Sequence, residues 1–137
     1  MQKRQIMIYL RANLFIGCDF VNMVLFLEYP KCTTCQKAKR WLDDKHMEYE
    51  DRNIKEERPS YEELKTWWRK SGQPLKKFFN TSGLLYKELG LKDKLPEMSE
   101  EEQLRLLASD GMLVNRPLLI GDHFVKIGFR EAQWEEL

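Results

Sequence analysis

Two cysteines, Cys32 and Cys35, are the residues of this chain whose types and spacing could do chemistry. They follow an apolar run at 23–27 and open a helical pattern, which puts Cys32 at a predicted helix N-terminus and Cys35 one turn further in. Unpaired backbone N–H groups and the positive end of the helix dipole favour a thiolate over a thiol at that first position. We therefore expect Cys32 to be the nucleophile. Cys35 lies on the apolar face of the predicted helix and would be the resolving thiol of a redox-active disulfide.

The cysteine pair has two other readings, half of a zinc site or an inert buried pair. A zinc site needs further ligands, and the remaining candidates, Cys18, His46 and His123, lack ligand spacing. The position at a helix start argues for reactivity and against an inert pair. Lys31, directly before Cys32, either favours the thiolate and an anionic substrate or is simply solvated. We expect a reactive pair and no metal.

The composition indicates one domain with no nucleic-acid or membrane partner. A chain of 137 residues, 42% of them hydrophobic and 33% charged, can bury one sizeable core but not two. The 23 basic and 22 acidic residues give a net charge of +1 and are interleaved, so no basic stripe is present. A single C-x-x-C in such a chain suits a reducing compartment. We expect a cytoplasmic monomer.

The first 22 residues are predicted to be an extension outside the fold. A basic start and the apolar run at 6–10 faintly resemble a signal peptide, but Arg11, Asn13 and Asp19 interrupt that run. The run is also too short to span a bilayer. Met23 directly precedes the first convincing strand, so an upstream start codon taken in error is one explanation. The predicted domain is therefore 23–137.

Sequence periodicity predicts a strand at 23–27, a helix over about 33–45 and a strand at 47–54. A strand–helix–strand unit of this length places its two strands parallel. Capping-box signatures at 60–63 and 99–102 predict helices ending at Gly72 and near 110, with short helical turns between them. Apolar runs at 114–120 and 123–127 then predict an antiparallel hairpin, followed by a short helix at 129–134.

This order predicts an α/β fold with a mixed sheet and a helical insertion between the second and third strands. Pro117 opens the third strand, and the two cysteines start the first helix. That is the arrangement of a thioredoxin-like or glutaredoxin-like fold, in which this proline is usually cis and its backbone faces the thiols. We therefore add Pro117 to the candidate substrate-binding residues.

With these residues in place, the chain resembles the arsenate reductase/Spx family of thioredoxin-fold proteins over about 23–137. The matching motifs are Tyr29-Pro30-Lys31-Cys32-Thr33-Thr34-Cys35, Phe79-Asn80-Thr81-Ser82-Gly83, Tyr86-Lys87-Glu88-Leu89-Gly90-Leu91, Leu95-Pro96 and Asn115-Arg116-Pro117-Leu118. The resemblance is closest to poorly characterised members that carry both cysteines. It implies a glutaredoxin-like core, a nucleophilic Cys32, and turnover that uses no bound cofactor but an external thiol reductant, glutathione with glutaredoxin or thioredoxin.

The resemblance also implies roles for two arginines. Arg116, before the proline, matches an arginine that helps bind an oxyanion in the reductases, and Arg130 matches a later one in the closing segment. A further oxyanion-binding arginine of the reductases falls at 76–80, where this chain has none. Glutaredoxin-coupled arsenate reductases lack a cysteine at the position of Cys35, whereas Spx-type regulators have one. The sequence alone leaves the substrate open.

Spx-type regulators supply the alternative hypothesis, a redox-sensing transcriptional regulator. They bind the C-terminal domain of the RNA polymerase α subunit through a glycine in the insertion and the arginine before the proline, which Gly72 and Arg116 could supply. Gly72 is equally explained as a helix C-terminus. Arg116 could instead pair with a surface carboxylate. We favour a thiol–disulfide oxidoreductase, because its chemistry needs only the visible cysteines.

Overall fold

A computed structural model of the chain describes residues 23–137, and the predicted extension at 1–22 lies outside the described residues. The longer elements are β1 (Val24–Glu28), α2 (Thr33–Asp44), β2 (Tyr49–Asn53), α3 (Tyr61–Ser71), α4 (Leu84–Glu88), α5 (Leu91–Lys94), α6 (Glu100–Ser109), β3 (Leu118–Ile120), β4 (Val125–Ile127) and α7 (Glu131–Trp134). Single 3-10 turns are η2 (Leu75–Phe78), η3 (Leu95–Glu97) and η4 (Gly111–Leu113).

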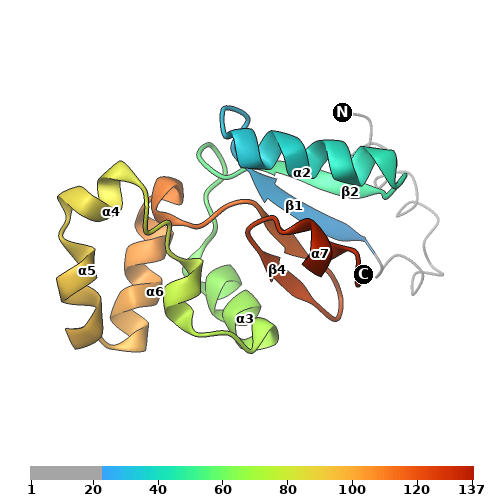
Figure 1. Cartoon of the computed structure of the whole chain (residues 1–137). Coiled ribbons are helices and arrows are strands. Elements are labelled where there is room, and N and C mark those ends of the chain that lie inside the picture. Colours follow the sequence, from blue (N-terminus) through green and yellow to red (C-terminus); the bar gives the residue numbers. More distant parts are fainter. Residues whose placement is uncertain (1–22) are drawn as a thin grey trace.

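The four strands form one mixed sheet in the order β2-β1-β3-β4. β1 and β2 are parallel, joined by the crossover helix α2, while β3 runs antiparallel to both β1 and β4. The helices α3 to α6 separate β2 from β3 and form a lobe beside the sheet (Figure 1). This confirms the predicted α/β class and the helical insertion between the second and third strands. Over residues 23–137, the helices fall short of the length and apolar character that a membrane span requires.

The two faces of the sheet carry separate apolar clusters. Under α2 and α7, a cluster rich in aromatic rings is formed by Val24, Phe26, Ala38, Leu42, Tyr49, Leu119 and Trp134. The opposite face packs on the insertion, where the larger cluster includes Leu27, Ile54, Leu64, Trp67, Phe78, Leu107, Leu113 and Leu118. Alternate residues of β1 thus serve opposite cores, as the twofold period of a strand requires.

Local sequence signals set most helix ends as predicted. Ser60 and Ser99 each cap a helix, and both capping boxes form with the glutamate three residues later. α3 ends at Gly72, whose φ of 67° is a left-handed conformation that glycine adopts without steric cost. α2 ends at Asp44, one residue before the predicted end.

The third strand begins directly after Pro117, the residue predicted to open it. The apolar run predicted for the hairpin starts earlier, at 114, but Val114 bridges Phe79, and the Asn115 N–H donates to the Phe78 carbonyl at 2.8 Å. Residues 114–115 therefore pair with the insertion and lie outside the hairpin. Local patterning does not reveal this long-range partner, which takes the backbone groups of 114–115.

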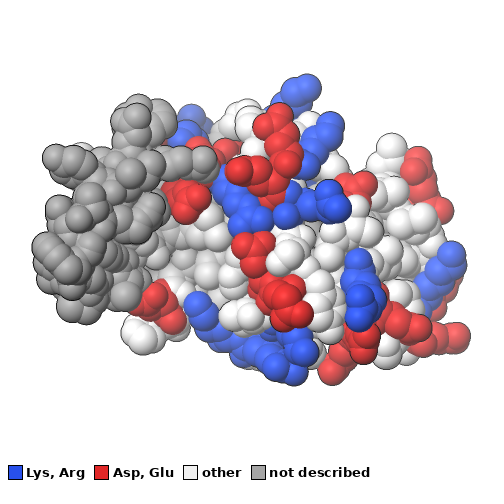
Figure 2. Space-filling view, turned by 180° about the vertical axis from the view of Figure 1, so that it is seen from behind, with Lys and Arg blue, Asp and Glu red and all other residues white. Residues whose placement is uncertain are grey.

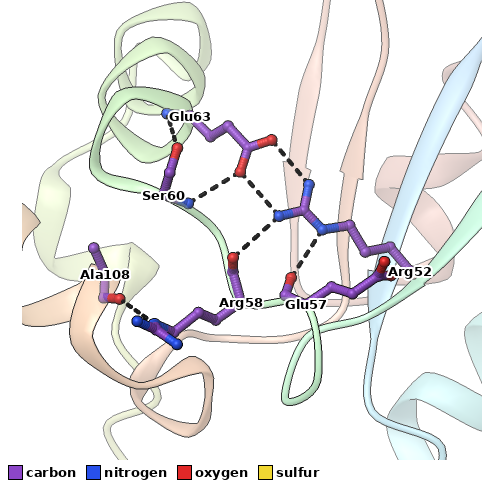
Figure 3. Close-up of polar contacts among 6 residues, drawn as sticks. All are labelled: Arg52, Glu57, Arg58, Ser60, Glu63 and Ala108. Atoms are coloured by element: carbon purple, nitrogen blue, oxygen red, sulfur yellow. Dashed lines mark hydrogen bonds and ion pairs between the residues drawn. The ribbon is translucent and has the colours of Figure 1, made fainter.

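One arginine ties the end of β2 to the insertion (Figure 3). The Arg52 guanidinium makes two hydrogen bonds to the Glu63 carboxylate, both of 2.9 Å, and donates to the carbonyls of Glu57 and Arg58. Glu63 is also the capping-box residue of α3. Arg58 extends the connection by donating to the Ala108 carbonyl at the end of α6. The start of the insertion is thus fixed against the sheet.

Candidate functional site

The two cysteines occupy the start of α2 as the sequence predicted. Cys32 is the N-cap residue, and its Sγ accepts the Cys35 N–H at 3.4 Å. Its carbonyl begins the helix by accepting the Gln36 N–H at 3.0 Å. Both cysteines are free thiols; Cys32 is partly exposed, whereas Cys35 is fully buried. A reagent from solvent can therefore reach one sulfur of the pair more easily than the other.

Burial sets the chemistry of the inner thiol. It raises the pKa of Cys35 far above its ordinary value, and the neighbouring Cys32 and Glu28 raise it further, although the Tyr29 N–H, at 3.5 Å from Sγ, partly offsets this. Desolvation penalises the charged form of any buried acid in this way. Cys35 therefore stays a thiol until something removes its proton.

Arg116 lies beside this loop. Its guanidinium carbon stands 5.5 Å from the centroid of the Tyr29 ring, and Nη1 donates to the carbonyls of Met112 and Val114, both at 3.2 Å. Its Nε is buried and has no hydrogen-bond partner within residues 23–137. The structure thus brings Arg116 to the thiol loop through Tyr29, whose N–H reaches Cys35. The peptide bond from Arg116 to Pro117 is cis, as the thioredoxin-like arrangement predicted.

The other candidate residues, Arg130, Lys31 and Gly72, are all exposed. Arg130 lines a groove of about 450 Å³ together with Lys76, Lys77 and Asn115, and its described walls include neither cysteine. Lys31 is exposed in the turn before α2. Gly72 is exposed at the end of α3, with no atom of residues 23–137 within 4 Å of where a Cβ would stand. The roles predicted for these residues stay predictions.

Sequence reasoning missed a polar cluster beneath α2. Glu28 ends β1 and is only 6% exposed, close to Asp51 of β2 and Lys39 of α2. The signal was present in β1, because the twofold period places residue 28 on the same face as Phe26. A carboxylate at a strand end is usually solvated, so the pattern alone does not single out this position.

On the face seen in Figure 2, basic and acidic side chains alternate, and neither sign forms a continuous patch. This agrees with the interleaved charges of the sequence. Within residues 23–137, the His, Cys, Asp and Glu side chains form no group of three or more that could hold a metal ion.

A C-x-x-C pair at the start of the helix after β1, together with a cis-proline directly before β3, is the arrangement of a thioredoxin-like protein. A family profile described as the ArsC family matches residues 27–137, and the chain belongs to that family. It is 58% identical over 111 residues to the uncharacterised protein YusI of Bacillus subtilis, covering 81% of this chain and 94% of that protein. These matches confirm the arsenate reductase/Spx family resemblance.

A solved structure and a transcriptional regulator are also similar to this chain. The crystal structure of a possible arsenate reductase from Streptococcus mutans superposes with a TM-score of 0.78 at 48% identity, covering 84% of this chain and 98% of that one. The global transcriptional regulator Spx 1 of Bacillus cereus is 27% identical over 111 residues, covering 81% of this chain and 83% of that protein. The chain is thus similar both to a protein described as a possible arsenate reductase and to one named as a transcriptional regulator.

Proposed function

We propose that this protein is a thiol–disulfide oxidoreductase in which Cys32 attacks the substrate and Cys35 resolves the product. The observation that carries the proposal is the asymmetry of the pair, with Cys32 partly exposed at a helix N-cap and Cys35 buried one turn further along. A helix N-terminus stabilises the thiolate that must attack. The buried partner is protected from competing reagents until the first step is complete.

The cycle has two exchanges. The Cys32 thiolate attacks one sulfur of a substrate disulfide, forms a mixed disulfide and expels the other sulfur as a thiolate. Cys35 then loses its proton, its thiolate attacks the Cys32 sulfur, and the remaining half of the substrate leaves as a second thiolate. Two electrons have passed to the substrate, and the Cys32–Cys35 disulfide remains. An external thiol, glutathione with glutaredoxin or thioredoxin, returns two electrons and restores both thiols.

Arg116 is the residue best placed to support this cycle. Its fixed charge lies near the thiol loop, against the Tyr29 ring. A charge-assisted hydrogen bond from an arginine suits an anionic group on a substrate or on a partner protein. Arg130 and Lys31 would extend such binding away from the thiols.

Turnover with a defined electron donor tests the proposal. The full chain is supplied with a disulfide substrate and with NADPH-coupled thioredoxin or glutaredoxin, and NADPH consumption is followed. We expect turnover that depends on both cysteines. Lack of turnover with either donor, in a protein whose thiols titrate as free, would contradict the proposal.

A regulator that uses the same disulfide as a switch is the second candidate. It is favoured by the match to Spx 1 and by the open surroundings of Gly72, which leave room for a partner at the end of α3. The test is a pull-down with the C-terminal domain of the RNA polymerase α subunit, in the reduced and oxidised states. Binding that changes with redox state and is lost in Gly72→Arg would favour the regulator. Equal retention by an unrelated control protein would exclude it.

A further inference from the structure

The strand β4 forms one edge of the sheet, and no other strand of residues 23–137 pairs with its outer side. Its inner side is bonded to β3 and its flanks. The Gly121 N–H donates to the Phe124 carbonyl at 2.9 Å, and the Gly128 N–H donates to the Pro117 carbonyl at 2.8 Å. These two bonds show that the backbone groups of residues 124 and 128 face β3.

The outer side of β4 presents unpaired backbone groups. In an antiparallel ladder every second residue bonds to the partner strand, so residue 126 faces β3 together with residues 124 and 128. The N–H and C=O groups of the two residues between them, Val125 and Ile127, therefore face outward. Within residues 23–137 these groups take part in no hydrogen bond. A strand edge of this kind is a template on which another chain can pair.

Two adjoining grooves run along this edge. The first has a volume of about 300 Å³ and is lined by the three residues of β4 together with Gln73, Lys77, Gln133 and Glu136. The second has a volume of about 450 Å³, shares Lys77, Ile127 and Gln133 with the first, and continues past Lys76 and Asn115 to Arg130. The lining residues thus come from the insertion and from α7, which cover opposite faces of the sheet (Figure 1). The open edge lies in a hollow between these two layers.

The charge of the grooves is positive. Lys76, Lys77 and Arg130 line the second groove, no acidic residue of the described chain lines it, and none of the three cations is in an ion pair within residues 23–137. In the first groove Glu136 lies 3.8 Å from Lys126, so its charge is already compensated. A ligand that lies along the edge therefore meets three uncompensated positive charges. Such a surface favours a ligand with acidic groups.

A second copy of this chain does not suit the edge. Twofold pairing of β4 with β4 of another copy would bring the same surface of both copies together. Lys77 and Arg130 of one copy would then approach the same residues of the other, and like charges across paired strands are destabilising. The charge of the grooves therefore favours a different chain as the occupant.

We propose that the edge of β4 binds an extended acidic segment of a partner protein as an added antiparallel strand. The backbone of the segment bonds to the outward groups of Val125 and Ile127, as in other cases of strand addition to an open edge. The residues opposite these two positions project on the same face as the Val125 and Ile127 side chains, which pack towards the insertion. Acidic side chains at these alternate positions would face Lys76 and Lys77 of η2. Neither cysteine lines the grooves, so this binding is separate from the proposed thiol chemistry.

Backbone methylation of a peptide tests the strand addition without changing the protein. The probe is a fluorescent seven-residue peptide with glutamate at its third and fifth positions and threonine elsewhere, and its binding to the full chain is followed by anisotropy. One modified peptide carries N-methyl groups on both glutamates, and a second carries them on the fourth and sixth residues. We expect saturable binding of the unmodified peptide. Methylation of the glutamates should abolish it, because their N–H groups face β4, and methylation of the other two residues should have little effect.

A charge reversal in the groove tests the acidic preference. Lys77 is exposed and lines both grooves, so Lys77→Glu should weaken peptide binding by about tenfold or more. The matched control is Lys55→Glu, which reverses an exposed lysine just after β2, the strand at the opposite edge of the sheet, and should bind like the parent. Binding by the parent should also weaken as salt is raised. Alkylation of Cys32 should proceed at the parent rate in both variants.

Each other outcome overturns the proposal. Absence of binding, or equal binding by the two methylated peptides, would refute strand addition at β4. Unchanged binding in Lys77→Glu would refute the acidic partner. An oligonucleotide of equal charge that binds more tightly than the peptide and also depends on Lys77 would identify a general polyanion surface instead. None of these results changes the expected turnover by the cysteine pair, so the proposed function stands or fails separately.

Discussion

The two faces of the sheet are built for different purposes. Beneath α2, apolar packing around Phe26 gives way at the end of β1 to a buried acid, an ion pair and a buried thiol. On the opposite face the core against the insertion is apolar, and Arg52 makes its polar contacts where the side chains are partly exposed. The first face thus holds buried polar groups in the same core as Cys35, whereas the second is an apolar framework. Changes on the first face should therefore alter chemistry, and changes on the second should alter stability.

The largest effect should come from replacing Cys32, the partly exposed thiol at the start of α2. Cys32→Ser replaces the attacking sulfur by a hydroxyl that stays protonated and is a poor nucleophile, so turnover should fall on the order of a thousandfold or more. Thermal unfolding should hardly change, because Cys32 is partly exposed. Coupled assays and melting curves on the same preparations check this. Substantial residual turnover would mean that another group attacks.

On the second face, Leu107→Ala should destabilise the fold without touching the chemistry. Leu107 is fully buried in the core against the insertion, and its truncation should cost about 3 kcal/mol. Urea unfolding measures this loss. The rate of resolution by Cys35 at a temperature where the variant is folded should stay within about twofold of the parent, since the cavity lies across the sheet. A large change in that rate would show that the two faces are coupled.

Glu28 should make stability depend on pH. Folding raises the pKa of Glu28 from about 4.5 to about 8, so within that range the folded state holds a proton that the unfolded state releases. This contribution to stability is present at low pH and is lost as pH rises through the window, by about 5 kcal/mol in total for a shift of this size. Glu28→Gln should remove this decline. Unfolding midpoints at a series of pH values test the sign, and a parent protein that gains stability relative to Glu28→Gln with rising pH would contradict it.

The smallest effect should come from replacing Arg52, which joins the end of β2 to the insertion. Arg52→Lys keeps the charge but loses the two-pronged contact with Glu63, and should cost about 1 kcal/mol. The matched control is Arg105→Lys, whose partner Glu101 lies one turn away on an exposed helix surface, and its unfolding midpoint should not move. Equal losses in both variants would mean that the Arg52 contact adds nothing to the attachment of the insertion.

The sequence predicted the features that depend on local signals. Apolar periodicity located β1 and α2, the capping boxes at Ser60 and Ser99 located α3 and α6, and Gly72 marked a helix end. These succeed because a cap or an amphipathic stripe involves residues close in the chain. The order of these elements then limited the topology to few choices.

Contacts between residues far apart in the chain were not predicted from the sequence. The surroundings of Glu28 include Asp51 of β2 and Lys39 of α2, which the crossover brings together. The contact of Arg116 with the Tyr29 ring also joins segments far apart in the chain. The pairing of 114–115 with the insertion is of the same kind. Residue type and local spacing do not encode such neighbours. The position of the two cysteines at a helix start was therefore predictable, but the groups that surround them were not.

Trapping the intermediate tests the central claim most directly. The full chain carrying Cys18→Ser and Cys35→Ser is treated with one equivalent of a disulfide substrate, digested, and mapped by mass spectrometry. We predict that the mixed disulfide accumulates on Cys32, whereas the parent with both thiols ends as a Cys32–Cys35 disulfide with no adduct. An adduct that stays on Cys32 when Cys35 is present, or no adduct on Cys32 when Cys35 is absent, would contradict the account.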